Sequence, residues 1–271
     1  MHDIHPTAVV DPAANLDADV KIGPLCHVGP SVTLGQGTQL ISHVSILGPT
    51  EIGRENTIWP HATLGGAPQD LKYNGEPTRL IVGDHNDIRE GVTMHRGTNH
   101  DDGTTRVGSH SLIMAYAHVA HDCVVGDRLV IGNSVNLGGH ICIEDHVIIG
   151  GAAAVHPFLT IAQHAYIGGM TRLVHDVPPF MILEGNPATV RGVNLIGLAR
   201  RGFASSDIDR LKLAYKKLFS RTMNGVAGQT AEAIAELTAQ FPDDPHIKAL
   251  VDSIRNANKG AHGRYRECLC R

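Results

Sequence analysis

The sequence predicts an all-β solenoid of short parallel strands, followed by a helical C-terminal part. Three observations lead to this prediction. An aliphatic residue recurs at every sixth position over most of residues 4–173, aromatic residues make up only 4% of the 271 residues, and the spacing becomes helical after residue 195. The cores of conventional sandwiches and bundles depend on large aromatic rings. A long chain with so few rings therefore needs a narrow aliphatic core.

The six-residue repeat is almost unbroken. Its aliphatic positions are Ile4 and every sixth residue to Leu64, then Val82, Ile88 and Met94, then Val107 and every sixth residue to Leu173. A small or β-branched residue usually stands two positions earlier, and glycine often follows directly. Such segments suit a three-sided coil of eighteen residues, whose turns pair as parallel strands about 4.8 Å apart. We expect the glycine to allow the sharp corner, where a positive φ is needed.

Two segments interrupt the repeat. Residues 65–81 keep the aliphatic positions in phase, whereas residues 96–106 shift them by one. Both are expected to be loops that leave the coil at a corner. Long loops on a rigid scaffold are usually functional or interfacial, and the simpler alternative is a tolerated surface insertion.

The repeat stops after the sequence VPP at 177–179, and helical spacing follows. We expect helices over about 205–219, 231–241 and 246–254, and a frayed tail over 258–271 in which Cys268 and Cys270 are incidental. The predicted organisation is a β-solenoid over 1–190, with loops 65–81 and 96–106, and a helical domain over 191–271.

Composition and charge exclude several classes of protein. The net charge of −4 is too close to neutral for a nucleic-acid coat, so we expect no nucleic-acid partner. The longest apolar runs fall well short of the roughly 20 residues that span a bilayer, and the first residues lack the pattern of a signal peptide. The five cysteines lack metal-knuckle spacing, which favours reduced thiols. We therefore expect a cytoplasmic protein without stable membrane insertion.

Several of the eighteen histidines should lie together. Residues eighteen apart stack in such a coil, so Asp122 should lie below His140, and His121 below Gly139. His156 should lie above Gly138, which places all of these residues on one outward-facing patch spanning three coils.

The residue types of this patch favour acid–base chemistry. A histidine is the usual general base near pH 7, a neighbouring carboxylate fixes its tautomer, and the N–H of Gly139 can stabilise an oxyanion. Cys123 and Cys142 are expected to point inward. In the absence of a clear nucleophile, the pattern favours direct transfer to an acceptor hydroxyl.

Two other classes remain open. Hexapeptide solenoids also carry carbonic-anhydrase activity, with zinc bound by three histidines between subunits. His118 with His121, or His95 with His100, offers such ligands. The other class is a catalytically silent assembly scaffold. Stoichiometric zinc would favour the former, and an unaffected His121→Ala phenotype would favour the latter.

The motifs point to one family. They are IHPTA from residue 4, QDLKY from 69, GEPTR from 75, HRGT from 95, AHVAHDC from 117, GGH from 138, IIGG from 148, DVPP from 176, GVN from 192 and RRGF from 200. Over residues 1–255 the chain resembles the acyl-carrier-protein-dependent UDP-N-acetylglucosamine O-acyltransferases that begin lipid A biosynthesis. The fold implied by this resemblance is the left-handed parallel β-helix of hexapeptide repeats, followed by a C-terminal α-helical domain.

The resemblance also implies a reaction. A hydroxyacyl chain passes from acyl carrier protein to the 3-hydroxyl of UDP-N-acetylglucosamine, without cofactor or metal, in a homotrimer whose active sites lie between subunits. His121 is then the general base, Asp122 its orienting partner, and Gly139 the oxyanion donor. The implied substrate-binding residues are Gln69, Asp70, Lys72, His95, His118, His140, His156, Asn194, Arg200 and Arg201.

Three further features bear on the substrates. Pro157 stands where the family often has an amide. Gly169 lies where the family varies a residue that closes the acyl groove, and Met170 is an alternative closure. The segment from Arg191 to Arg221 contains eight basic residues and only two acidic ones. This positive charge favours docking of an acidic carrier protein near Arg200 and Arg201. A solvated basic helix face is the alternative.

Overall fold

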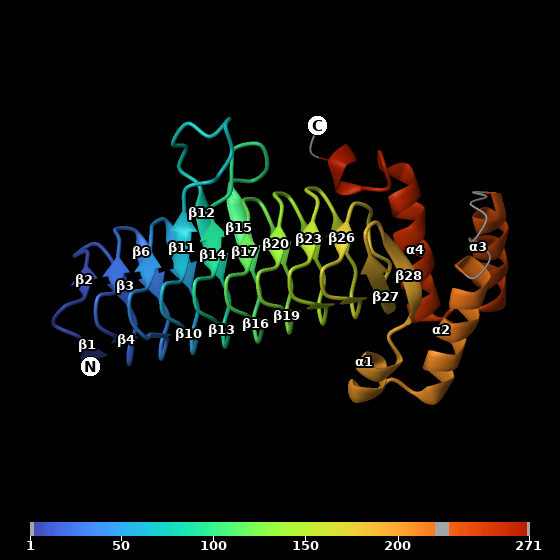
Figure 1. Ribbon diagram of the computed structural model, residues 1–271, viewed down its shortest axis with the longest axis horizontal. Helices are drawn as coiled ribbons and strands as arrows, with labels where there is room; N and C mark the ends of the chain where they lie inside the picture. The colour runs from blue at the N-terminus through green and yellow to red at the C-terminus, as the bar shows by residue number, and fades with distance from the viewer. Residues whose placement is uncertain (1–2, 220–227, 270–271) are drawn as a thin grey trace.

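The computed structural model describes residues 3–219 and 228–269 (Figure 1). Short strands wind into a parallel β-helix with three sheets. The first sheet contains β1 (Asp3–Ile4), β4 (Lys21–Ile22), β7 (Gln39–Leu40), β10 (Thr57–Ile58), β13 (Asp87–Ile88), β16 (Leu112–Ile113), β19 (Val130–Ile131), β22 (Ile148–Ile149), β25 (Tyr166–Ile167), β27 (Met181–Gly185) and β28 (Ala188–Val193).

The second sheet contains β2 (Val9–Val10), β5 (His27–Val28), β8 (Ser45–Ile46), β11 (Thr63–Gly66), β14 (Thr93–His95), β17 (His118–Val119), β20 (Asn136–Leu137), β23 (Ala154–Val155) and β26 (Arg172–Leu173). The third contains β3 (Asn15–Leu16), β6 (Val32–Leu34), β9 (Thr50–Ile52), β12 (Arg79–Val82), β15 (Thr104–Val107), β18 (Val124–Val125), β21 (Cys142–Ile143) and β24 (Thr160–Ile161).

The strand register follows the eighteen-residue coil. Ile4 pairs with Ile22, and Leu137 pairs with Val155, each eighteen positions apart. The aliphatic residues of the repeat fill the inside of the coil, and most of them are fully buried. Ile4 in the first coil is 40% exposed, because no coil covers it on the N-terminal side. The predicted column of stacked aliphatic residues is therefore present.

The glycines that follow the aliphatic residues have a different role from the one expected. Apart from Gly65, their φ values are not positive; the positive φ falls three residues after the aliphatic position, at residues such as Leu25 and His43. At Gly23, a Cβ atom would lie 1.8 Å from the carbonyl oxygen of Ile41 in the next coil. Glycine is thus required by the close approach of stacked backbones, and the corner itself accepts side chains.

Both loops leave the coil at the same corner, between the second and third sheets; we call this the loop corner. Leu64 of β11 pairs with Met94 of β14, thirty positions on, and Arg79 of β12 pairs with Thr104 of β15, twenty-five positions on. The extra residues form the two loops that project from the upper side of the β-helix in Figure 1.

The C-terminal part contains α1 (Leu195–Arg200), α2 (Ser205–Leu218), α3 (Gly228–Gln240), α4 (Pro245–Lys259) and a short 3₁₀ helix, η2 (Arg266–Cys268). Helices were expected at α2, α3 and α4, whereas α1 was not. Phe180 is fully buried at the end of the coil, in one core with Leu211 of α2 and Leu250 of α4. The helices therefore continue the aliphatic core beyond the last strands and shield the end of the β-helix.

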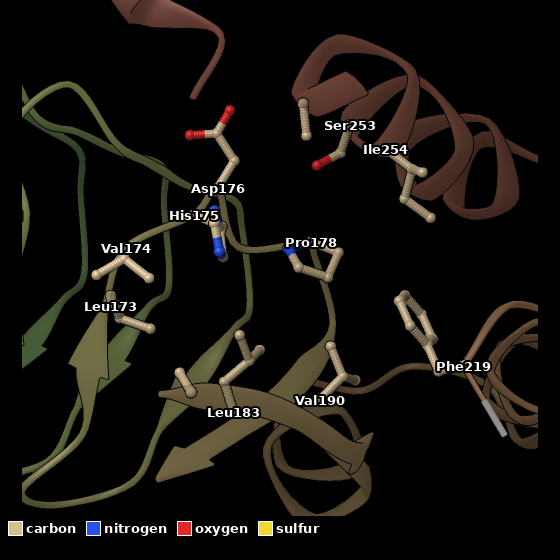
Figure 2. A pocket seen from close by; sticks show the side chains of 12 residues that line it. Leu173, Val174, His175, Asp176, Pro178, Leu183, Val190, Phe219, Ser253 and Ile254 are labelled. Atoms are coloured by element: carbon tan, nitrogen blue, oxygen red, sulfur yellow. The ribbon is translucent and has the colours of Figure 1, made fainter. Parts of the chain in front are cut away.

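An apolar pocket lies where α4 approaches the last coil (Figure 2). Leu173 and Leu183 line it from the β-helix side, and Phe219 and Ile254 from the helical side. Among the helices in the described ranges, none combines the length and apolar character needed to cross a bilayer.

Candidate active site

Two hollows in the surface meet at the loop corner. One runs across the second sheet past His118 and His156, and the other lies against loop 65–81 and includes Lys72. Both are lined by His121 and Gly139. The two residues predicted to perform and support the chemistry therefore lie where two potential binding spaces join.

His121 and Asp122 form a directly bonded pair. Nδ1 of His121 lies 2.8 Å from Oδ2 of Asp122, and the imidazole is only slightly exposed. An ionised carboxylate can only accept, so Nδ1 carries the proton and donates it. The lone pair of the neutral ring is then on Nε2, which is the tautomer that a general base needs.

Asp122 is buried, contrary to the expectation that it faces outward. Its side chain is 1% exposed, because Thr98 of loop 96–106 folds over it. The N–H of Thr98 donates to Oδ1 at 2.7 Å, and the Thr98 hydroxyl donates to Oδ2 at 2.6 Å. Burial alone would raise the pKa of Asp122, but the hydrogen bonds from His121 and Thr98 outweigh it and hold the pKa below its ordinary value. The carboxylate is thus ionised and fixed.

His140 stands one coil above Asp122 and is also buried. Its Nε2 lies 3.6 Å from Oδ2 of Asp122, and its Nδ1 lies 3.5 Å from Oδ2 of Asp101 in loop 96–106. The ring stacks on Phe158 of the next coil, with centroids 4.4 Å apart. Burial lowers the pKa of His140, and the Asp122 carboxylate opposes this effect. The eighteen-residue arithmetic therefore brings Asp122, His140 and Phe158 into one column.

Gly139 supports the His121 ring from one coil above. A Cβ atom on Gly139 would lie 2.5 Å from Cε1 and 2.7 Å from Nε2 of His121. The ring therefore occupies the space that any side chain at position 139 would need. Among the described residues, none accepts a hydrogen bond from the N–H of Gly139. The N–H of Gly139 is therefore a donor without an acceptor among the described residues, one coil above the His121 ring.

His95 and His118 lie on the second sheet next to this pair. Their rings meet edge to face, with centroids 4.8 Å apart, and Nδ1 of His118 lies 2.8 Å from Oγ1 of Thr93. Burial lowers the pKa of His95 to about 4, helped by the charges of His118, His121 and Arg96. Burial also lowers the pKa of His118. These rings are neutral at pH 7, so they offer hydrogen bonds without charge.

Other predicted residues line the two hollows without touching the His121–Asp122 pair in the described contacts. Gln69 lines both hollows, and Asp70 and Lys72 line the one against loop 65–81. Within that loop, Oδ1 of Asp70 accepts from the Lys72 N–H at 3.0 Å. His156 is exposed, and its Nδ1 lies 3.0 Å from the carbonyl oxygen of Pro157.

The remaining predicted residues lie away from His121 within one chain. Asn194 is the N-cap of α1: its Oδ1 accepts from the N–H of Gly197, and its Nδ2 donates to the carbonyl of His164 at 3.0 Å. Arg200 and Arg201 follow at the exposed end of α1. Figure 1 shows α1 on the side of the molecule opposite the two loops. A single chain does not bring these residues to the pair.

Gly169 and Met170 also lie on another corner, between the first and second sheets. Both are exposed, and Met170 is 81% exposed at a positive φ.

The prediction that Cys123 and Cys142 point inward is correct only for Cys123. Cys123 is fully buried with its pKa raised by burial to about 12, so it does not form a nucleophilic thiolate near pH 7. Cys142, expected to point inward, instead lies half-buried on the outside of the coil, where it lines a pocket with Arg266. The inward position two residues before Ile143, which holds a small residue in most repeats, is occupied by Ile141.

One group of described residues has the donors and spacing to hold a metal ion, namely His121, Asp122 and His140. It contains two histidines instead of the three expected for a carbonic-anhydrase zinc. The Asp122 carboxylate is already engaged by one bond from His121 and two from Thr98. This pattern is typical of a histidine positioned by a carboxylate.

Sequence reasoning did not find three residues of this cluster. Thr98 holds Asp122, Asp101 lies near His140, and Arg266 donates from Nε to the carbonyl of His140 at 2.9 Å. Thr98 was quoted only within the HRGT motif. Asp101 and Arg266 lie in a loop and a tail without any repeat, so no spacing rule could place them.

Known proteins resemble the chain over nearly its whole length. Residues 176–262 match the family model described as UDP N-acetylglucosamine O-acyltransferase, domain 2, and residues 104–139 match the bacterial transferase hexapeptide model. A curated acyl-(acyl-carrier-protein)–UDP-N-acetylglucosamine O-acyltransferase of Saccharophagus degradans is 48% identical over 258 residues, covering 95% of this chain and 98% of that protein. A protein of the same name from Thermodesulfovibrio yellowstonii is 45% identical over 260 residues, covering 96% and 99%.

A solved structure agrees with these relatives. The UDP-N-acetylglucosamine O-acyltransferase of Moraxella catarrhalis superposes with a TM-score of 0.87 at 44% identity, covering 93% of this chain and 96% of that one. The predicted left-handed β-helix of hexapeptide repeats with a helical C-terminal region is thereby confirmed. The chain is an acyltransferase, and it belongs to the family of acyl-(acyl-carrier-protein)–UDP-N-acetylglucosamine O-acyltransferases.

Proposed function

We propose that this protein transfers a 3-hydroxyacyl chain from acyl carrier protein to the 3-hydroxyl of UDP-N-acetylglucosamine, as the first step of lipid A biosynthesis. The names of the relatives supply the substrate classes. The observation that carries the mechanism is the His121 imidazole, bonded through Nδ1 to a buried carboxylate and packed on Gly139.

The proposed reaction is a direct acyl transfer. Nε2 of His121 takes the proton of the sugar 3-hydroxyl as the oxygen attacks the thioester carbonyl carbon. The N–H of Gly139 donates to the oxyanion of the tetrahedral intermediate, and the Asp122 carboxylate stabilises the imidazolium. The C–S bond then breaks, and the imidazolium returns its proton to the departing pantetheine sulfur. The reaction needs no cofactor or metal.

The proposed binding residues surround this centre. Gln69, Asp70 and Lys72 act on the nucleotide-sugar from loop 65–81. The uncharged rings of His95 and His118 suit a sugar, because hydrogen bonds from neutral groups discriminate hydroxyls without attracting other anions. His140 and His156 complete the wall along the coils.

The acyl chain is proposed to lie along the second sheet, limited by Gly169 and Met170. We further propose a homotrimer with the active sites between subunits. Large apolar side chains are exposed along the corner between the first and second sheets, where Leu25, Tyr116 and Met170 are 57%, 69% and 81% exposed. Leu71, in the loop beside His121, is fully exposed. In the proposed trimer, these side chains are buried against another copy.

The same packing is the proposed route by which Arg200 and Arg201 of one chain reach the acyl donor or nucleotide phosphates at another chain's His121. Both polar atoms of the Asn194 amide already form hydrogen bonds within the chain. These contacts favour a role for Asn194 in fixing the first residue of α1.

The proposed compartment is the cytoplasm. The four cysteines in the described residues, Cys26, Cys123, Cys142 and Cys268, are free thiols, which fits a reducing environment.

The test is an assay of the purified protein with UDP-N-acetylglucosamine and a panel of hydroxyacyl carrier proteins. His121→Ala should lower kcat by about 10²–10⁴-fold, the usual contribution of a positioned general base. His110→Ala is the matched control, because His110 is an exposed corner histidine remote from the loop corner. Wild-type turnover by His121→Ala contradicts the mechanism. An inactive wild type across the whole panel contradicts the substrate assignment.

A further inference from the structure

The C-terminal tail is ordered against the β-helix, although the sequence predicted a frayed end. Residues 261–269 turn back from α4, with a bridge between Ala261 and Arg264 and the short helix η2. The N–H of Asp176 donates to the carbonyl of Gly263 at 2.8 Å, and the carbonyl of His262 lies 2.6 Å from Nδ1 of His175. The tail is therefore fastened to the last full coil.

A half-buried carboxylate and a buried guanidinium anchor this segment. Oδ2 of Asp176 accepts from the Tyr265 N–H at 2.9 Å, while its Oδ1 accepts from Thr160 at 2.7 Å. Figure 2 shows the Asp176 carboxylate directed away from the apolar pocket. Arg264 is 9% exposed; its Nη1 donates to the Val174 carbonyl at 3.3 Å, and its Nη2 pairs with Glu267 at 2.8 Å. These contacts fix the backbone on both sides of Tyr265.

Anchored in this way, the tail delivers Arg266 to the loop corner. Nε of Arg266 donates to the His140 carbonyl at 2.9 Å, and Nη2 lies 3.7 Å from Oδ2 of Asp101. The side chain is only 20% exposed and lines a pocket with Cys142. A guanidinium thus contacts both the backbone of His140 and the carboxylate beside its ring.

These contacts continue to the proposed base without a gap. Asp101 lies 3.5 Å from Nδ1 of His140, and Nε2 of His140 lies 3.6 Å from Oδ2 of Asp122. Asp122 in turn bonds His121 at 2.8 Å. Charged and titratable groups therefore alternate from the tail to His121.

We propose that Arg266 is a positioning residue of the active site, which holds His140 and Asp101 so that His140 stays neutral beside the His121–Asp122 pair. The inference rests on the proposed role of His121 as the base. The family model of the C-terminal domain matches residues 176–262, so Arg266 lies beyond the matched segment.

The physical basis is a balance of charges around one buried ring. Asp122 from the coil below and Asp101 from loop 96–106 favour a protonated His140, whereas burial and the nearby His121 favour the neutral form. Phe158 covers the ring from the coil above and adds no charge. Arg266 offsets the charge of Asp101. Without it, the pKa of His140 rises, and a protonated His140 competes for Asp122 and opposes formation of the His121 imidazolium.

The test compares Arg266→Ala, Arg266→Lys and Arg255→Ala in the full chain. Arg255 is the matched control, because it is an exposed arginine on α4 that pairs with Asp252. Arg266→Ala should lower kcat at pH 7 by about tenfold, with little change in KM, and should move the acid limb of the kcat profile to higher pH. Arg266→Lys should restore the acid limb, because it keeps the charge, with a partial recovery of kcat.

A second readout does not depend on activity. The His140 imidazole, assigned by its loss in His140→Asn, is titrated by NMR in protein carrying isotope-labelled histidine. Its midpoint should rise in Arg266→Ala and stay unchanged in Arg255→Ala. An unchanged midpoint overturns the inference, and so does a kcat lowered equally at all pH values. An inactive wild type in which the midpoint still moves overturns the proposed function and leaves the charge balance supported.

Discussion

Nδ1 of His121 lies 2.8 Å from Oδ2 of Asp122, whose carboxylate accepts two hydrogen bonds from Thr98, one at each oxygen. The pair has one chemical consequence. Because Asp122 is ionised and cannot donate, His121 presents its free lone pair at Nε2, toward the two hollows that meet at Gly139.

Asp122→Asn tests this tautomer. The asparagine oxygen can still accept from the Thr98 N–H, while its amide would face Nδ1 of His121 as a donor. The ring would then carry its proton on Nε2 and lose its proposed function as a base. We expect kcat to fall by about 10²–10⁴-fold with little change in thermal stability.

Asp127→Asn is the control, because Oδ1 of Asp127 accepts from the Ser109 N–H at 2.7 Å at another corner of the coil, away from the site. Equal activity of the two variants would refute the assigned tautomer.

Gly139→Ala tests the packing of the base on the coil above. The new methyl group would lie 2.5 Å from Cε1 of His121, so the ring has to move. A displacement near 1 Å in a reacting group costs on the order of 10²-fold in rate. Gly192→Ala is matched to it, because a Cβ atom there meets no heavy atom within 4 Å. Activity is measured beside the melting temperature of each variant. A fully active Gly139→Ala protein would show that the contact does not set the position of His121.

The column at the loop corner was predictable because parallel coils leave no freedom of register. Once the coil has eighteen residues, Asp122 and His140 must stack, and the arithmetic needs no contact information. The burial of Asp122 was not predictable, because it depends on Thr98 in a loop without any repeat.

The role of the glycines was misread for a physical reason. A positive φ and a close backbone approach both select glycine in a sequence, and only the coordinates separate the two at Gly23. The position of Arg266 could not be predicted for another reason. It follows from contacts between the tail and Asp176, which no spacing rule describes.

The stability of the protein should depend on pH through His164. Its ring is 9% exposed, stacked on His146 and facing Phe180, and burial lowers its pKa to about 4, with the charges of His146 and Arg201 adding to the effect. The unfolded chain takes up this proton near pH 6.5, whereas the folded chain does not until about pH 4. The contribution of His164 to the free energy of unfolding is therefore fully present above pH 6.5, and it is lost as the pH falls toward 4.

His164→Phe should reduce the loss of unfolding free energy at low pH, because phenylalanine cannot titrate. The fold should accept the ring, because Phe158 and Phe180 already occupy corner positions with a positive φ. Between pH 7 and 4.5, the variant should lose about 2 kcal/mol less unfolding free energy than the wild type. His110→Phe, at an exposed corner in a stack with His85, is the control. Parallel pH curves for His164→Phe and the wild type, measured by chemical denaturation, would rule out this source of acid sensitivity.

The basic surface at α1 and α2 provides the last test, which concerns the acyl donor. Arg200 and Arg201 are exposed at the end of α1, and Lys216 and Lys217 lie in the last turn of α2; Arg221, counted with them in the sequence, lies outside the described residues. Acyl carrier protein is strongly acidic, so docking here should respond to charge reversal. Arg200→Glu combined with Arg201→Glu should raise KM for the acyl carrier protein by about tenfold or more at low ionic strength.

The salt dependence separates docking from a contact with the sugar nucleotide. Screening shortens the reach of surface charges from about 10 Å at 0.1 M salt to about 3 Å at 1 M, so the difference between the variant and the wild type should shrink as salt is added. KM for UDP-N-acetylglucosamine should stay unchanged if the arginines serve docking alone. Lys248→Glu combined with Lys259→Glu, two exposed lysines of α4, makes the same change in net charge and is the control. A double variant with an unchanged donor KM at low salt would place the carrier protein elsewhere, because electrostatic attraction is strongest under those conditions.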